Sequence, residues 1–176
     1  YVNEDLDELK VEMPMFGSCF GFQALVRAFG GKVEVVPEMK ELGTHELRLT
    51  EEGREDDFFG EHPDAFDAQF GHKDSATGEP DVLSVLGRTE RCPIQAVRHP
   101  DLPILATQFH PEMTEEDNKQ RYMSYLREYA EPGITPEEAR RKAEAMHRPS
   151  PHANELLRQF LREVAGHRAR SAVRKR

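Results

Sequence analysis

Cysteine and long apolar runs are scarce in this sequence. Its 176 residues hold two cysteines, too few for a disulfide framework, which predicts a reducing, cytoplasmic environment. No apolar run approaches the roughly 20 residues that a membrane-spanning helix needs, and no signal peptide is visible, so no membrane partner is expected. The net charge of −9 argues against non-specific nucleic-acid binding, and the basic residues among the last eleven are interpreted as a solvated end.

The motifs that hold nucleotides and metals are also missing. The glycines show neither the Gly-X-Gly-X-X-Gly nor the phosphate-loop spacing, so no nucleotide site is indicated. His45-Glu46 lacks a second histidine four residues on, so it is not interpreted as a metal site. Cys92 precedes a proline at the start of a predicted strand and is interpreted as structural. The sequence therefore predicts no cofactor and no metal.

A short apolar run that meets a helical pattern is the most informative feature present. The run Met15-Phe16 ends in Gly-Ser-Cys-Phe-Gly, and the helical pattern begins at once. Such a strand–turn–helix corner exposes a nucleophile, here Cys19, on a tight bend. Both glycines, Gly17 and Gly21, are expected because a Cβ would clash there, and the helix N-terminus would favour the thiolate. Cys19 is therefore a candidate nucleophile, with a buried structural cysteine as the alternative.

A second stretch offers the partners that a cysteine nucleophile needs. The alternating run 105–109 predicts a strand that stops at His110, and Glu112 follows two residues later. A cysteine needs a base to take its proton, and that base needs a third group to fix its tautomer. His110 and Glu112 are the right residue types for these two roles. An ordinary buried or surface histidine is the alternative for His110 alone.

Together these stretches resemble the class I (triad-type) glutamine amidotransferase family. The resemblance lies in Gly-Ser-Cys-Phe-Gly-Phe-Gln at 17–23 and Gln-Phe-His-Pro-Glu at 108–112, and Phe-Gly-His-Lys-Asp at 70–74 resembles the substrate loop of the GMP-synthase-like branch. It covers roughly residues 1–130. The sequence departs from the family at Phe22, where many members carry histidine beside the glutamine pocket.

The resemblance implies a flavodoxin-like α/β fold. The expected sheet is open and mostly parallel, with helices on both faces and a small antiparallel section. The family's first strands and helices, and a Gly-rich loop just before Tyr1, are not matched, so the sequence is interpreted as an N-terminally shortened copy, a fragment, or a sequence with a mis-assigned start. Two regions are expected: an amidotransferase-like domain over 1–130, and a helical extension with a basic tail over 131–176.

The resemblance also assigns roles to particular residues. It implies a thioester on Cys19, with His110 as general base and acid and Glu112 orienting the histidine ring. The backbone N–H of Phe20 would bind the oxyanion, with a second donor from the Gly-rich loop. The residues implied in glutamine binding are Gln23, His72, Lys73 and Asp74. An ordinary helix-surface residue is the alternative for Gln23, and an exposed polar turn is the alternative for the other three.

These assignments predict an enzyme, a cysteine-dependent glutamine amidotransferase. It would hydrolyse the side-chain amide of glutamine and release glutamate and ammonia. The chain has no synthetase domain, so a separate synthetase subunit would bind the ammonia acceptor. Two alternatives stay open: a γ-glutamyl peptidase or hydrolase, and a catalytically inactive amidotransferase-like regulatory module.

Periodicity, caps and breakers predict the secondary structure. Strands are expected over 15–19, 32–36, 45–50, 66–70, 82–87, 94–98 and 104–109. Helices are expected over 3–10, 22–29, 114–130, from 135 onward and over 152–165, with a helical turn at 56–60 and a loop at 71–74.

Overall fold

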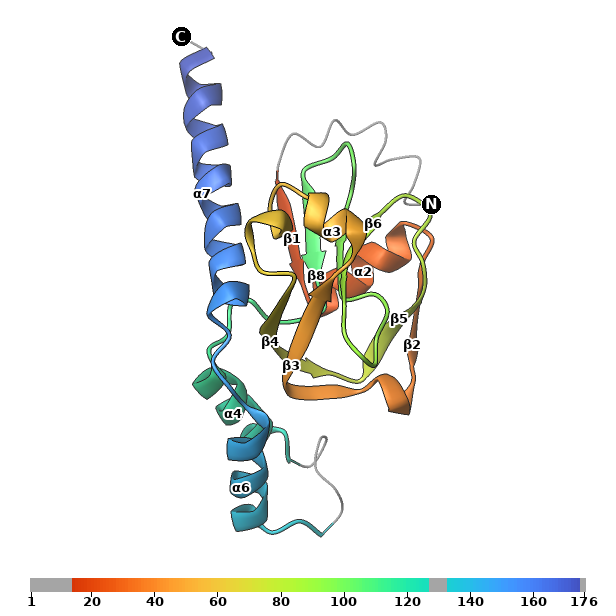
Figure 1. Cartoon of the computed structure of the whole chain (residues 1–176), viewed down its shortest axis with the longest axis vertical. Helices are drawn as coiled ribbons and strands as arrows, with labels where there is room; N and C mark the ends of the chain where they lie inside the picture. Colours follow the sequence, from red (N-terminus) through yellow and green to blue (C-terminus); the bar gives the residue numbers. More distant parts are fainter. Residues whose placement is uncertain (1–13, 127–132, 175–176) are drawn as a thin grey trace.

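The computed structural model describes residues 14–126 and 133–174, with side chains as far as Val164. The helix expected over 3–10 lies outside the described residues. Figure 1 shows a sheet domain flanked on one side by α4 (Glu115–Ser124), α6 (Pro136–Met146) and α7 (Pro151–Arg174), the last of which runs past the sheet.

A six-stranded sheet forms the centre of the domain. Its strands, in spatial order, are β1 (Met15–Ser18), β8 (Ile104–Thr107), β7 (Ala96–Arg98), β6 (Ser84–Arg88), β3 (Glu41–Leu49) and β4 (Ala65–His72). The β1–β8 pair is parallel and the other four pairings are antiparallel. Because parallel strands end at the same edge, the residues that follow β1 and β8 are brought together.

A second, two-stranded sheet lies beside the first. In it β2 (Lys32–Val35) pairs antiparallel with β5 (Asp74–Gly78). The helices are α2 (Phe20–Ala28), α3 (Glu51–Glu55), α4 (Glu115–Ser124), α6 (Pro136–Met146) and α7 (Pro151–Arg174), with 3₁₀ turns η1 (Pro37–Met39) and η2 (Phe59–Glu61).

Two apolar clusters cover the two faces of the main sheet. One joins Phe22, Val26 and Phe29, from α2 and the residue after it, to Val97 and Ile104. The other joins Ala153, Leu156 and Phe160 of α7, together with Phe58 and Phe59 at the start of η2, to side chains of β3 and β4. An α/β sheet with helices on both faces is confirmed, and the arrangement is flavodoxin-like. Within the described residues the sheet is mixed rather than mostly parallel, because only the β1–β8 pairing is parallel.

The second cluster joins the two predicted regions. Ala153, Leu156 and Phe160 lie beyond position 130, and each is at most 7% exposed. Each Å² of apolar surface that is removed from water stabilises the folded chain by about 25 cal/mol, so the burial of these three side chains stabilises the domain. The first half of α7 therefore contributes to the main core, and the boundary near residue 130 stays a prediction.

Several local predictions are confirmed. Helix α2 ends at Ala28, and Gly30 has φ +85°, a conformation that suits glycine at a helix end. Thr114 caps α4 by accepting a hydrogen bond from the N–H of Asp117, whose carboxylate bonds back in a capping box. Pro136 occupies the start of α6 as expected.

The helical turn expected at 56–60 is confirmed, since the N–H of Gly60 donates to the Asp56 carbonyl (2.8 Å), and a 3₁₀ turn follows at Phe59–Glu61. Helix α3, with Thr50 as its cap, was not predicted. The loop expected at 71–74 is wrong in its bounds, because β4 continues to His72 and β5, which was not predicted, begins at Asp74. Its partner β2 is distant in sequence, and a two-stranded pairing of this kind leaves a weak local pattern.

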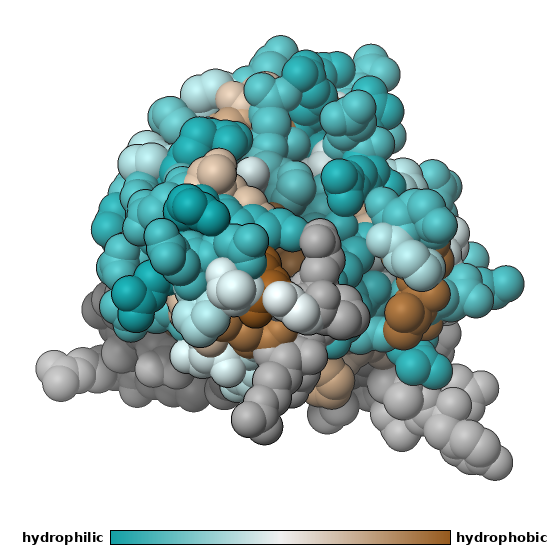
Figure 2. All heavy atoms as spheres, turned by 90° about the horizontal axis from the view of Figure 1, so that it is seen from below, coloured by the Kyte–Doolittle hydropathy of each residue, from teal (hydrophilic) through white to brown (hydrophobic). Residues whose placement is uncertain are grey.

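The face of the molecule seen from below is largely hydrophilic (Figure 2). Figure 2 looks at the molecule from below, and hydrophobic colour is confined to small areas of that face. Within residues 14–126 and 133–174, no helix combines the length and the apolar character that crossing a membrane requires.

Candidate active site

Cys19 occupies a strained corner between β1 and α2. Among the residues that the structure describes, Cys19 is the one non-glycine residue whose φ is positive, with φ 47° and ψ −96°. L-residues rarely adopt such a conformation, which is a feature of functional sites. The corner is held from both sides, since the N–H of Cys19 donates to the Thr107 carbonyl (2.8 Å) and its carbonyl accepts from the N–H of Gln23 (3.0 Å). The side chain of Cys19 is partly exposed.

The two glycines beside Cys19 have different surroundings. A Cβ on Gly17 would lie 2.9 Å from the Gly21 carbonyl carbon and 2.9 Å from Cδ1 of Leu25. A Cβ on Gly21 would meet no atom within 4 Å. The predicted clash is therefore confirmed at Gly17 and wrong at Gly21, because the helix turns that residue's Cα outward.

This difference predicts opposite effects of two alanine substitutions. We expect Gly17→Ala to lower the free energy of unfolding by about 1–3 kcal/mol through overpacking. Gly21→Ala should raise it by ~0.5 kcal/mol, because alanine favours a helix more than glycine does. Urea unfolding followed by circular dichroism measures both. A Gly17→Ala chain as stable as the parent would show that the corner can widen.

His110 and Glu112 form a hydrogen-bonded pair just after β8. Nδ1 of His110 lies 2.6 Å from Oε1 of Glu112, and the ring is buried while the carboxylate is 43% exposed. The backbone N–H of His110 donates to the Gln69 carbonyl (2.8 Å), which ties this segment to β4. The hydroxyl of Ser18 donates to Oε2 of Glu112 (3.0 Å). Both carboxylate oxygens are therefore held, and the imidazole orientation is fixed.

The electrostatics of the pair follow from these contacts. Burial lowers the pKa of His110, but its contacts with Cys19 and Glu112 outweigh burial and raise the pKa above 6.5. Burial raises the pKa of Glu112, but its hydrogen bond with His110 brings the pKa below 4.5. The contribution of His110 to stability is complete below pH 6.5 and is lost as the pH rises through its folded pKa. That of Glu112 is present above pH 4.5 and is lost as the pH falls, so both act between these values.

A chain of amides links the sulfur to the first residue of β5. Nε2 of Gln108 donates to Sγ of Cys19 (3.5 Å), and Oε1 of Gln108 accepts from Nε2 of Gln23 (3.2 Å). Nε2 of Gln23 also donates to the Asp74 carbonyl (3.0 Å). The structure thus places Gln23, one turn into α2, against Asp74 of the predicted substrate loop and connects it through Gln108 to the sulfur. Phe20 is 80% exposed and opens α2, where backbone N–H groups lack intrahelical partners.

The three predicted residues of the loop are placed differently. Asp74 is exposed and Lys73 is partly buried. His72 is 3% exposed, and its ring turns inward: Nε2 lies 3.2 Å from Oε2 of Glu41, and Nδ1 lies 3.1 Å from the Asp74 carbonyl. The His72 side chain therefore supports the loop from the buried side, while Lys73 and Asp74 remain at least partly exposed.

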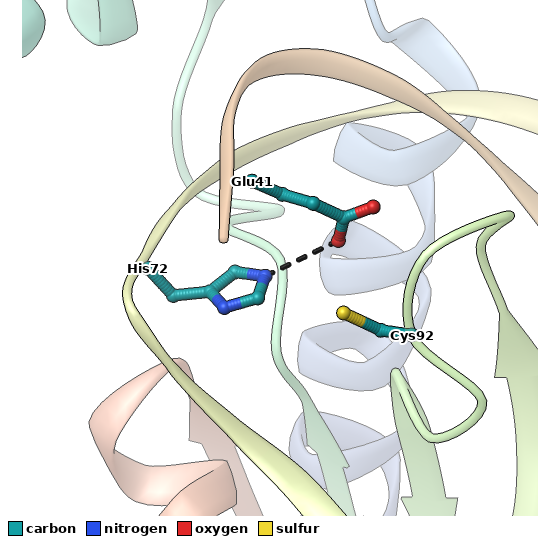
Figure 3. Close-up of side chains that lie close together, drawn as sticks. All are labelled: Glu41, His72 and Cys92. Carbon is teal, nitrogen blue, oxygen red and sulfur yellow. Dashed lines mark hydrogen bonds and ion pairs between the residues drawn. The ribbon is translucent and has the colours of Figure 1, made fainter. Parts of the chain in front are cut away.

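The inward-facing His72 belongs to a buried polar cluster with Glu41 and Cys92 (Figure 3). One ligand-type atom from each residue lies within 4.8 Å of the others. The Cys92 thiol donates to the Met39 carbonyl (3.1 Å). Burial, reinforced by the Glu41 carboxylate, raises the pKa of Cys92 to about 12. This sulfur is a protonated hydrogen-bond donor at neutral pH, which fits the structural interpretation of Cys92.

Comparison with known proteins decides the family. The sequence model of the protein family described as glutamine amidotransferase class-I matches residues 4–126, which include the corner at Cys19 and the His110–Glu112 pair. The chain belongs to the class-I glutamine amidotransferase family.

The similar relatives of this amidotransferase chain include subunits of glutamine-hydrolyzing GMP synthases. It is 34% identical over 110 residues to such a subunit of Methanopyrus kandleri, covering 62% of this chain and 57% of the relative. The corresponding protein of Pyrococcus abyssi is 36% identical over 115 residues, covering 65% of this chain and 58% of the relative. The chain thus spans less than two thirds of these relatives.

Solved structures share the fold. A glutamine amidotransferase from Thermotoga maritima superposes with a TM-score of 0.69 at 23% identity, covering 93% of this chain and 66% of the other. A glutamine amidotransferase from Methylobacillus flagellatus gives a TM-score of 0.63 at 21% identity, covering 93% of this chain and 64% of the other. At these identities the likeness concerns the fold.

The amidotransferase motifs left three residues of the site unassigned. Gln108 lies in the motif at 108–112, and its contact with Cys19 could have been suspected from that position. Ser18 lies beside Cys19, but its hydrogen bond to Glu112 spans 94 positions. Arg121 carries no motif signal, yet Nη1 lies 2.6 Å from Nε2 of His110. Phe22, expected beside the glutamine pocket, is fully buried in the cluster under α2.

Proposed function

We propose that this chain hydrolyses the side-chain amide of glutamine, with Cys19 as nucleophile, His110 as general base and acid, and Glu112 as the group that orients the histidine. The observation that carries the proposal is the strained corner at Cys19, which follows β1, next to the His110–Glu112 pair, which follows the parallel neighbour β8. Membership of the family supports it.

The proposed reaction begins with transfer of the Cys19 proton to Nε2 of His110. The thiolate attacks the amide carbon, and the backbone N–H of Phe20 stabilises the oxyanion. His110 returns the proton to the departing ammonia, which leaves a thioester on Cys19. His110 then activates water, the thioester is hydrolysed and glutamate leaves. Glu112 stabilises the imidazolium in both halves.

Substrate contacts are proposed for the amides and the loop. Gln23 reaches both Gln108 and the Asp74 carbonyl, so it lies where a substrate beside the sulfur could be contacted. Lys73 and Asp74 would approach the amino-acid end of the substrate, and His72 would fix their backbone. Relatives carry the name of a GMP synthase subunit, and we propose that the ammonia passes to an acceptor on a separate synthetase subunit.

A diazoketone analogue of glutamine tests this function without depending on turnover. We expect it to label Cys19 covalently and to leave Cys92 unlabelled in the same chain, because the latter is buried and its pKa is about 12. Excess L-glutamine should slow the labelling. Mass spectrometry of peptides from samples taken at successive times measures the labelled fraction of each cysteine.

The competing outcomes are distinct. Protection by γ-glutamyl peptides but not by glutamine would favour a γ-glutamyl hydrolase. Labelling of Cys19 that no amide slows, or no labelling at all, would contradict the proposal and would favour an inactive module.

A further inference from the structure

Arg121 reaches into the candidate active site from α4. Its Nη1 lies 2.6 Å from Nε2 of His110, and its Nη2 lies 3.4 Å from the Gly71 carbonyl. A Cβ on Gly71 would lie 3.1 Å from Nη1, so the guanidinium fits closely against a residue without a side chain. Arg121 is thus held between the histidine and the start of the predicted substrate loop.

The helix that carries Arg121 is anchored to the sheet. One turn earlier, Nδ2 of Asn118 donates to Oε1 of Gln69 (3.2 Å) and to the Phe70 carbonyl (3.1 Å), and Asn118 is 2% exposed. The capping box at Thr114 fixes the start of α4. Residues three apart share a helix face, so Asn118 directs Arg121 toward the end of β4. The arginine contact with His110 follows from this anchoring.

The contact with Arg121 defines the protonation state of the histidine. A guanidinium only donates hydrogen bonds, so Nε2 of His110 accepts, and its Nδ1 donates to Glu112. While this contact lasts the ring is neutral, although Cys19 and Glu112 raise its pKa, because Nε2 can hold either a proton or the arginine N–H. In the proposed mechanism this nitrogen takes the proton of Cys19. Arg121 has to leave Nε2 before that transfer occurs.

A carboxylate is the ligand that would draw Arg121 away. The planar guanidinium matches a carboxylate in paired, charge-assisted hydrogen bonds, which are about twice as strong as bonds to neutral acceptors. Free glutamine carries such a group next to its α-carbon, whereas a glutamine side chain inside a protein does not. The amide end would then reach Cys19 while the acid end binds Arg121.

We infer that Arg121 is a specificity-determining residue that blocks Nε2 of His110 until a substrate with a free carboxylate displaces it. This inference rests on the proposed function. On displacement, the S–H bond of Cys19 breaks and an N–H bond forms at Nε2, which gives a thiolate and an imidazolium, and Arg121 keeps all its protons. The site then responds to free amino-acid amides and stays unreactive toward amides without the acid.

The first experiment measures Cys19 alkylation by neutral iodoacetamide as a function of pH. The charged and titratable groups described around the His110 ring are Cys19 of the corner, Glu112 of its own segment and Arg121 of α4. In Arg121→Ala, Nε2 is free to take the thiol proton, so the alkylation profile should move to lower pH and the rate at pH 7 should rise about tenfold. Arg121→Gln should behave similarly. The control Gln120→Ala, on the exposed side of the same helix, should match the parent chain.

The second experiment compares L-glutamine with 4-aminobutanamide, which lacks only the carboxylate. The parent chain should prefer glutamine in kcat/KM by about 10- to 150-fold, the range expected for a hydrogen bond to a charged group. Arg121→Ala should lose most of that preference, through a higher KM for glutamine and a higher kcat for the carboxylate-free amide.

The outcomes separate this inference from the proposed function. Unchanged or slower alkylation in both Arg121 variants would overturn it, since a guanidinium that merely stabilised the thiolate would give slower alkylation when removed. Faster alkylation in a chain that hydrolyses neither amide would support the block on His110 while the proposed function fails. If Arg121→Ala loses its circular dichroism signal, Arg121→Gln gives the same readouts.

Discussion

Replacing Cys19 by serine should abolish glutamine hydrolysis, with a fall in kcat on the order of 10⁴-fold or more. A serine hydroxyl is far less acidic than a cysteine thiol. The neutral imidazole of His110 is therefore too weak a base to form as much alkoxide as thiolate. The geometry of the corner would remain, because its strain is held by backbone hydrogen bonds to Thr107 and Gln23. Glutamate formation measures the loss, and thermal unfolding checks that the fold is retained.

Cys92→Ser provides the matched control for that substitution. The serine hydroxyl can still donate to the Met39 carbonyl, as the thiol does at 3.1 Å, so the chain should keep its turnover. Some stability should be lost, because a polar group replaces sulfur at a position only 1% exposed. Full activity in Cys19→Ser, or loss of activity confined to Cys92→Ser, would exclude Cys19 as the nucleophile.

Glu112→Gln should lower kcat by about 10²- to 10⁴-fold, because an uncharged amide neither fixes the tautomer of His110 nor stabilises the imidazolium. The Glu112 side chain is 43% exposed, so solvent screens its charge and favours the lower end of this range. The substitution should also bring the pKa of His110 down, since the contact with Glu112 raises it. Glutamate formation and an NMR titration of the His110 ring measure the two effects.

Ser18→Ala is the milder companion of that substitution. It removes one hydrogen bond, from Ser18 to Oε2 of Glu112 at 3.0 Å, and leaves the bond to His110 in place. A hydrogen bond of this type contributes about 0.5–1.5 kcal/mol, so the loss in kcat should stay within about tenfold. Equal losses in Ser18→Ala and Glu112→Gln would show that the carboxylate acts through its position alone.

The parts of the fold that could be predicted from the sequence are those that depend on residues close together along the chain. The apolar stripe of Phe22, Val26 and Phe29 predicted a helix with one buried face, and all three are at most 5% exposed. The caps at Thr114 and Thr135 were readable because capping involves residues three apart. The strand β5 was missed, because its pairing with β2 depends on a segment about forty residues away.

The sequence by itself determined the residue types of the site and their order along the chain. It provided a cysteine between two glycines, then a histidine and a carboxylate two residues apart. Their chemistry is local, because a thiol, an imidazole and a carboxylate carry the same proton affinities into any fold that brings them together.

Only the tertiary structure decided which groups meet these residues. The parallel β1–β8 pair places Cys19 beside His110, and an anchored helix brings Arg121 onto the same ring. It also turned His72 away from the sulfur and toward Glu41. Contacts between residues tens of positions apart depend on strand register and helix packing, which no local pattern of residues specifies.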